Sequence, residues 1–155
     1  MELNEKLVNK LIEKKYKIST AESCTGGLLA SKIVEVANAS KVFDMSFVTY
    51  SNESKIELLG LSENLISQFG VVSEEVATKM AYMVSRKAKS DIGVGISGIA
   101  GPTGDTPTKP IGMVCFGFYV NGTTYSITKY FGNIGRNNVR NLSVTFALEF
   151  LNSIL

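Results

Sequence analysis

Residues 19–27, STAESCTGG, hold the densest group of side chains able to do chemistry in this sequence. Ser23, Cys24 and Thr25 stand in a row, and the pair Gly26–Gly27 follows them. Glycines let a ligand approach the backbone, and free N–H groups at a helix start attract a phosphate or an oxyanion. Spacing alone leaves two interpretations open. The segment is a catalytic or substrate-binding turn, or Ser23 or Thr25 simply caps a helix.

The sequence contains no histidine, and this absence restricts the chemistry. Ser-His-Asp and Cys-His catalytic groups are excluded, as are zinc sites that need histidine. Any general base must therefore be Lys, Tyr, Asp, Glu or water. A helix N-terminus can lower the pKa of Cys24, but the thiol lacks the usual histidine partner. Cys115 lies in the apolar segment MVCFGFYV and is expected in the core.

A second candidate group is TYSNESK at residues 49–55. Tyr50 ends a predicted strand, and Lys55 follows in the first turns of the next predicted helix. A lysine with a lowered pKa can act as a base where histidine is lacking, and a neighbouring tyrosine can relay or hold the proton. The alternative is an aromatic residue at a strand end and a solvated surface lysine.

A third candidate is the segment SGIAGPTG at residues 97–104. Ser97 offers a hydroxyl, and the backbone from Gly98 onward can line a pocket. Long Gly/Pro loops after a buried strand are often functional, although a plain surface loop is the alternative. Arg136, near the start of the last predicted helix, can pair with a phosphate or remain a surface charge.

The elements that must position these residues alternate along the chain. Helices are predicted at 2–15, 25–37, 51–60, from Ser62, from Ser73 to about Lys89, and at 136–155. Strands are predicted at 16–23, 45–50, 91–100, 111–120 and 123–131, the last two joined by an Asn-Gly hairpin turn. This pattern predicts an α/β fold, a three-layer α/β/α sandwich with a mixed β-sheet. Ligands of such sheets bind at the carboxyl ends of strands, so 22–27, 50–55 and 97–104 are expected to converge.

Composition limits the number of domains, the partners and the location that this chain can have. The 155 residues predict one domain, 1–155. Lys+Arg 16 against Asp+Glu 14 gives a net charge of +2, which argues against nucleic acid or an anionic membrane as partner. No segment approaches the ~18 apolar residues of a membrane span, and the charged N-terminus is not a signal peptide. Two distant cysteines favour a reducing cytoplasmic location. Apolar residues in the hairpin and last helix leave a homo-oligomer open.

Five motifs occur in a fixed order: AESCTGGLLA, FVTYSNESKIELLG, GVVSEE, SGIAGPTG with KPIG, and FGNIGRNNVR. Together they resemble the C-terminal domain of the CinA (competence/damage-inducible protein) family, over residues 5–153. Members of this family that stand alone look like nicotinamide mononucleotide deamidases. The chain shows no counterpart of the N-terminal domain of longer members, so the single-domain form is expected.

The resemblance implies an amidohydrolase of pyridine nucleotide recycling, which converts nicotinamide mononucleotide and water to nicotinate mononucleotide and ammonia. The implied partner is this small nucleotide, and no metal or organic cofactor is implied. The family pattern places the nucleophile at Ser23, with Tyr50 and Lys55 as its activating partners. It places substrate contacts at Thr25, Gly26, Gly27, Ser97, Gly98 and Arg136. Backbone N–H groups of the 24–27 turn or the 98–101 loop would stabilise the oxyanion.

Two other functions remain as alternatives. One is a catalytically silent CinA-like module that binds a nucleotide or a protein and is linked to competence or DNA damage. The other is an amidohydrolase for a different nicotinamide-bearing nucleotide. The chain departs from the family pattern at Ser97, where threonine is usual, and before Arg136, where Gly135 lacks the expected acid.

Overall fold

A five-stranded mixed sheet forms the centre of the computed structural model, which describes residues 1–155. The strand order is β2-β1-β3-β4-β5. The three parallel strands are β1 (Ile18–Glu22), β2 (Phe47–Val48) and β3 (Ile92–Gly98). The hairpin of β4 (Met113–Val120) and β5 (Thr123–Tyr130) adds two antiparallel strands beside β3. The mixed sheet predicted from the sequence is confirmed.

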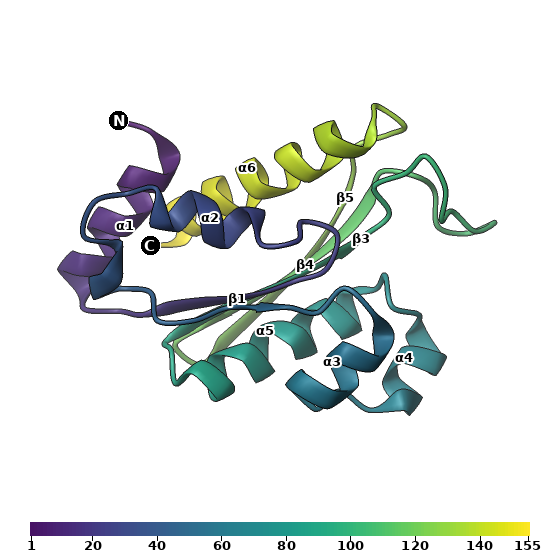
Figure 1. Ribbon diagram of the computed structural model, residues 1–155, viewed down its shortest axis with the longest axis horizontal. Coiled ribbons are helices and arrows are strands. Elements are labelled where there is room, and N and C mark those ends of the chain that lie inside the picture. Colours follow the sequence, from purple (N-terminus) through teal and green to yellow (C-terminus); the bar gives the residue numbers. More distant parts are fainter.

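Helices cover both faces of the sheet (Figure 1). One face carries α1 (Leu3–Lys14), α2 (Leu28–Val34) and α6 (Arg136–Ile154). The other carries α3 (Asn52–Leu59), α4 (Glu63–Phe69) and α5 (Glu74–Ala88). A 3₁₀ turn, Ala39–Lys41, lies between α2 and β2. The predicted three-layer α/β/α sandwich is therefore confirmed.

The two interfaces of the sheet differ in how they are packed. Large apolar side chains, among them Phe116, Phe118 and Leu151, fill the layer under α1, α2 and α6. On the opposite face α5 lies almost directly on the backbone of the sheet. A Cβ atom at Gly95 or Gly117 would collide with the Ala77 carbonyl of α5, and one at Gly93 with the carbonyl of Ala81. Glycine in the strands thus permits the close approach of this helix.

Local sequence signals locate several helix ends correctly. The hydroxyls of Ser51, Ser62 and Ser73 accept hydrogen bonds from the third backbone N–H after each of them, as N-caps do. Gly60 ends α3 in the left-handed conformation. The Asn121–Gly122 turn has positive φ at both residues, which is the conformation that this hairpin turn requires.

Two predicted elements are much shorter than expected, whereas the other elements with both ends predicted lose at most two residues at either end. The helix predicted at 25–37 begins only at Leu28 and ends at Val34, because residues 23–27 form a turn rather than helix. The strand predicted at 45–50 is reduced to Phe47–Val48, which pairs only with the end of β1. An edge strand with one short partner has few ladder hydrogen bonds, so its β-branched composition overstates its length.

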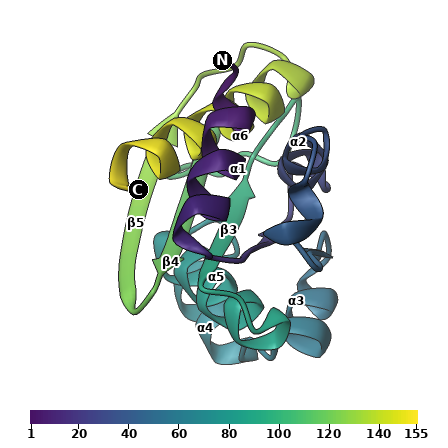
Figure 2. The same ribbon diagram turned by 90° about the vertical axis from the view of Figure 1, so that its left-hand side faces the viewer.

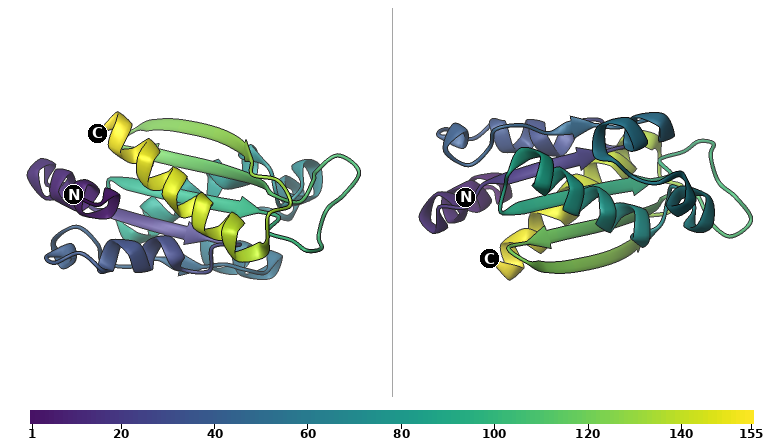
Figure 3. Two further views of the ribbon diagram at one scale, coloured as in Figure 1. Left: turned by 90° about the horizontal axis from the view of Figure 1, so that it is seen from above. Right: turned by 90° about the horizontal axis from the view of Figure 1, so that it is seen from below.

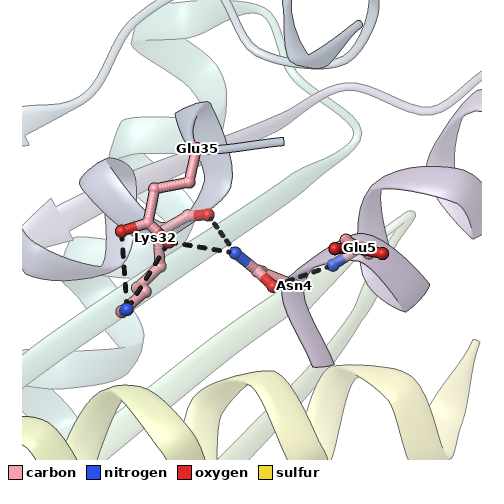
Figure 4. A network of polar contacts seen from close by, with 4 residues as sticks. All are labelled: Asn4, Glu5, Lys32 and Glu35. Carbon is pink, nitrogen blue, oxygen red and sulfur yellow. Dashed lines mark hydrogen bonds and ion pairs between the residues drawn. The ribbon is translucent and has the colours of Figure 1, made fainter. Parts of the chain in front are cut away.

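The N-terminal helix is tied to both helices that share its face. The Asn4 amide donates to the Lys32 carbonyl at 2.8 Å and to the Glu35 carboxylate at 3.3 Å (Figure 4). In Figure 2 α1 stands in front of α6 and crosses it, and the Asn152 amide donates to the Leu3 carbonyl at 3.0 Å. A surface groove of about 640 Å³ lies between α1, α2 and α6. No helix is both long enough and apolar enough to cross a membrane.

Candidate active site

The three segments that were expected to converge meet at one end of the sheet. Ser23 directly follows β1, Thr49 directly follows β2, and Ser97 lies at the end of β3. Because β1 lies between β2 and β3 in a parallel arrangement, these residues share the carboxyl edge of the sheet. In Figure 3 the arrows of β1 and β3 point to this end, and the loop between β3 and β4 extends beyond it. The convergence predicted from the strand pattern is confirmed.

Ser23 and Lys55 form a direct pair inside the protein. Lys55 Nζ donates to Ser23 Oγ at 3.0 Å. Lys55 has no exposed surface and Ser23 is only 8% exposed, so the contact is largely shielded from bulk water. Lys55 reaches Ser23 from the second turn of α3, whose start is set by the Ser51 cap. The lysine is therefore an internal residue of the site and not a solvated surface charge.

Two backbone carbonyls complete the surroundings of Lys55. Its Nζ donates to the Thr49 carbonyl at 2.6 Å and to the Tyr50 carbonyl at 3.4 Å. Burial lowers the pKa of Lys55 from 10.5 to about 8, because desolvation disfavours the charged amine. A neutral amine has two N–H donors and one lone pair. The two carbonyls can occupy both donors, which leaves the lone pair for the Ser23 hydroxyl.

A cavity of about 350 Å³ opens beside this pair. Its wall includes Ser23, Tyr50 and Asn52, together with residues 97–100, Thr103 and Gly104. Arg136 is the one charged residue among those that line it, and no carboxylate faces the guanidinium there. A cavity of this size suits a small molecule, and its single cation favours an anionic one.

Tyr50 and Arg136 form one unit on the cavity wall. Arg136 Nη2 donates to the Tyr50 hydroxyl and Nη1 donates to the Gly101 carbonyl, both at 2.8 Å. Tyr50 is 62% exposed, and its contact with Lys55 is made by its backbone carbonyl and not by its phenol. The structure therefore brings the Tyr50 hydroxyl to Arg136, whereas the Lys55 amine alone lies at Ser23.

The other predicted site residues divide into two groups. Ser97 and Gly98 line the cavity, with the Ser97 hydroxyl donating to the Val71 carbonyl at 2.7 Å. Thr25 does not line the cavity: it is fully buried, and its hydroxyl has no hydrogen-bond partner. Gly26–Gly27 also lie outside the cavity wall, and their positive φ angles serve the turn itself. The second half of the turn, residues 25–27, therefore lies away from the cavity.

Neither cysteine has the surroundings that make a thiol reactive, because both are buried. Burial raises the pKa of Cys24 from 9.0 to about 11, which opposes the lowering that a helix N-terminus would give. The helix begins at Leu28, four residues beyond Cys24, so its free N–H groups are not at the sulfur. Burial also raises the pKa of Cys115, which is fully buried in β4 as predicted.

Glu22 is a residue of this region whose role sequence reasoning missed. Its carboxylate is fully buried and accepts hydrogen bonds from the Leu29 and Ala30 amides at 2.9 Å and from the Thr20 hydroxyl at 2.8 Å. It thereby caps α2 from the residue just before Ser23. A carboxylate between a buried strand and a small-residue turn is the signal that could have revealed it.

Arg140 was also missed, although it lies one helical turn after Arg136. Its Nε donates to the Cys24 carbonyl at 2.9 Å and its Nη2 to the Thr25 carbonyl at 3.0 Å. The spacing of four residues, which places both arginines on one side of α6, was the available signal. Nowhere do three or more His, Cys, Asp or Glu side chains gather so that they could hold a metal ion.

The larger groove between α1, α2 and α6 is a poorer candidate for the active site. It is lined by none of the predicted site residues. The smaller cavity at the carboxyl edge of the parallel strands is lined by Ser23, whose hydroxyl is bonded to the buried Lys55 amine of lowered pKa. Fold and site together define an α/β/α protein with a serine–lysine pair at the strand ends.

Comparison with known proteins then gives the family. The family model of the CinA C-terminal domain matches residues 1–155, and the chain belongs to this family. It is 51% identical over 153 residues to a CinA-like protein of Kosmotoga olearia, covering 99% of this chain and 37% of that protein. The chain thus spans little more than a third of the length of this curated relative.

Solved structures of the same superfamily have closely similar folds. A competence-damaged protein (CinA) superfamily protein from Escherichia coli superimposes with a TM-score of 0.95 at 33% identity, covering 99% of this chain and 88% of that one. A competence/damage inducible protein from Agrobacterium tumefaciens gives a TM-score of 0.91 at 36% identity, covering 99% and 96%. The family resemblance read from the motifs is confirmed by these matches.

Proposed function

We propose that this protein is an amidohydrolase in which Ser23 is the nucleophile and Lys55 is the general base. The observation that carries the proposal is the 3.0 Å contact between Lys55 Nζ and Ser23 Oγ, made by an amine whose pKa is about 8. A base with a pKa near the working pH removes a proton efficiently. In a chain without histidine, this pair supplies what a serine nucleophile requires.

The reaction follows from the positions of these two groups. Neutral Lys55 accepts the Ser23 proton while Ser23 Oγ bonds to the carboxamide carbon. The resulting oxyanion is stabilised by backbone N–H groups beside Ser23. Lys55 then returns the proton to the nitrogen as the C–N bond breaks and ammonia leaves. A water molecule, deprotonated by Lys55, then attacks the acyl-serine ester. Lys55 returns this proton to Ser23 Oγ as the C–O bond breaks, which releases the carboxylic acid and restores the enzyme.

The substrate proposed is nicotinamide mononucleotide, converted to nicotinate mononucleotide. Arg136 supports a phosphate-bearing substrate, because it is a guanidinium on the cavity wall with no carboxylate partner. Ser97 and the Gly98 backbone, which line the same cavity, would contact the ribose or the ring. Tyr50 acts here as the residue that orients Arg136, while the proton moves between Ser23 and Lys55 directly.

The test is ammonia release from nicotinamide mononucleotide by the wild type, Ser23→Ala and Lys55→Met. The matched control is Lys41→Met, which removes an exposed lysine that lines neither the cavity nor the larger groove. The wild type and the control should turn over, and both site variants should lose ~10³-fold or more of the rate.

Three results would count against parts of the proposal. A wild type that binds the nucleotide tightly without releasing ammonia would support a binding module instead. Full activity in Ser23→Ala would refute the nucleophile and direct attention to Cys24. Release of ammonia from a different nicotinamide-bearing nucleotide, and not from the mononucleotide, would keep the mechanism but change the substrate.

A further inference from the structure

The turn after Ser23 is held from a distant part of the chain. Arg140 of α6 donates from Nε to the Cys24 carbonyl at 2.9 Å and from Nη2 to the Thr25 carbonyl at 3.0 Å. Its remaining contact is with the Asn137 side-chain oxygen at 2.9 Å, so no carboxylate neutralises the guanidinium. Arg140 is not among the residues that line the cavity, which separates it from Arg136.

The backbone of this turn has two donors without acceptors. The Ser23 carbonyl accepts from the Gly26 N–H at 3.1 Å, and the Ser23 N–H donates to Ile96. The N–H groups of Cys24 and Thr25, which come between, donate to no other residue of the protein. Adjacent unpaired N–H groups form the kind of concave site that binds an anion. They follow the nucleophile directly, and of the two residues Cys24 lines the cavity whereas Thr25 is fully buried.

Peptide geometry links these donors to Arg140. In a trans peptide the N–H points opposite to the carbonyl of the preceding residue. The Cys24 carbonyl is held toward Arg140, so the Thr25 N–H is directed away from α6. The Ser23 carbonyl is held toward Gly26, so the Cys24 N–H is directed away from the inside of the turn. A charged donor on a carbonyl also polarises that peptide and strengthens its N–H as a donor.

We infer that Arg140 is a positioning residue for the oxyanion hole. It fixes the Cys24–Thr25 and Thr25–Gly26 peptides, and through the Gly26 N–H, which donates to the Ser23 carbonyl, it keeps the Cys24 N–H aligned beside the nucleophile. This inference rests on the proposed role of Ser23 as nucleophile. Arg140 touches neither substrate nor the reacting atoms, and it acts only through the backbone. Its loss lets the turn rotate, and the Cys24 N–H loses its alignment with the developing negative charge.

The test uses a fluorophosphonate, which phosphonylates an activated serine through a transition state that also needs an oxyanion hole, and which requires no knowledge of the substrate. Labelling of Ser23 in Arg140→Met should be ~100-fold slower than in the wild type. Arg140→Lys, which keeps the charge and can reach one carbonyl, should recover part of the rate. Arg86→Met, an exposed arginine of α5, is the matched control and should label like the wild type.

The pH profile separates positioning from general loss of structure. In Arg140→Lys the plateau rate should fall, while the midpoint near pH 8 stays where Lys55 places it. With a substrate that turns over, kcat should fall and KM should stay within about twofold of the wild type. Slower labelling in Arg140→Lys and Arg140→Met upholds the inference even if nicotinamide mononucleotide proves not to be the substrate.

Three outcomes overturn the inference. One is wild-type labelling rates in both Arg140 variants. Another is a rise in KM with unchanged kcat, which would make Arg140 a substrate-binding residue. The last is a wild type that is not labelled at Ser23, which removes the nucleophile and the oxyanion hole together.

Discussion

Burial of Lys55 should make the stability of this protein depend on pH in a way that one substitution removes. The pKa of Lys55 is about 8 in the folded protein, against 10.5 for an unperturbed lysine. Between these values the unfolded chain binds more protons than the folded one, so the free energy of unfolding rises with pH. Below pH 8 both states are protonated, and the cost of burying the charge, ~3 kcal/mol, is present in full.

The size of the effect follows from the two pKa values. From pH 6 to pH 9 the Lys55 contribution to the free energy of unfolding should increase by about 1.4 kcal/mol, and from pH 6 to pH 10 by about 2.6 kcal/mol. Lys55→Met has no such group, so the difference between wild type and variant should increase by these amounts. At pH 6 the variant is stabilised by the loss of a buried charge. It also leaves the Thr49 carbonyl without a hydrogen-bond donor, which costs ~1–3 kcal/mol.

The assay is urea unfolding of wild type, Lys55→Met and the surface control Lys41→Met at pH 6, 9 and 10. Taking the difference between proteins cancels the titrating groups that do not interact with Lys55. Cys24 does interact with it, and its raised pKa makes stability fall above about pH 9, so the comparison is cleanest between pH 6 and pH 9. Lys41→Met should follow the wild type at every pH. An equal pH dependence in wild type and Lys55→Met would refute the reasoning, because it would mean that Lys55 is not held in its neutral form.

Three further predictions concern the site and the sheet. The wild-type kcat/KM should rise about tenfold per pH unit below an apparent pKa near 8 and level off above it, since only neutral Lys55 accepts a proton; a flat profile would contradict this. Arg136→Met should raise KM for nicotinamide mononucleotide ~10-fold or more, and leave turnover of the riboside without phosphate unchanged, if the guanidinium binds phosphate. Equal losses on both compounds would instead assign it a structural role. Gly95→Ala should lower the free energy of unfolding by ~1–3 kcal/mol in urea titrations, because its methyl group meets the Ala77 carbonyl; an unchanged midpoint would show that α5 can shift.

Local signals predicted those parts of the fold that depend on neighbouring residues. The serine caps before α3, α4 and α5, the glycine that ends α3 and the Asn-Gly hairpin turn each involve hydrogen bonds within four residues. The strand pattern also predicted the layers and the meeting of three strand ends, because parallel strands share one carboxyl edge. The strand β2 is shorter than predicted because it has few ladder hydrogen bonds. The helix α2 begins later than predicted because a turn precedes it.

The absence of histidine was the strongest information in the sequence by itself, since it restricted any base to lysine, tyrosine, a carboxylate or water. Which of Tyr50 and Lys55 reaches Ser23 was decided only by the tertiary structure. Packing directs the Lys55 amine inward to Ser23, while the Tyr50 phenol turns outward to Arg136. A strand end fixes where a residue stands, but the direction of its side chain depends on elements distant in the sequence.

The same reason explains the residues around the nucleophile. Thr25 and Ser23 are two positions apart in one turn, yet one hydroxyl is enclosed and the other reaches the cavity. Arg140, which is more than a hundred residues away in the sequence, donates hydrogen bonds to the backbone of that turn. The sequence by itself determined the chemical groups and the edge of the sheet that carries them. The tertiary structure decided their orientation, because orientation comes from packing against α3 and α6 and not from the neighbouring residues in the chain.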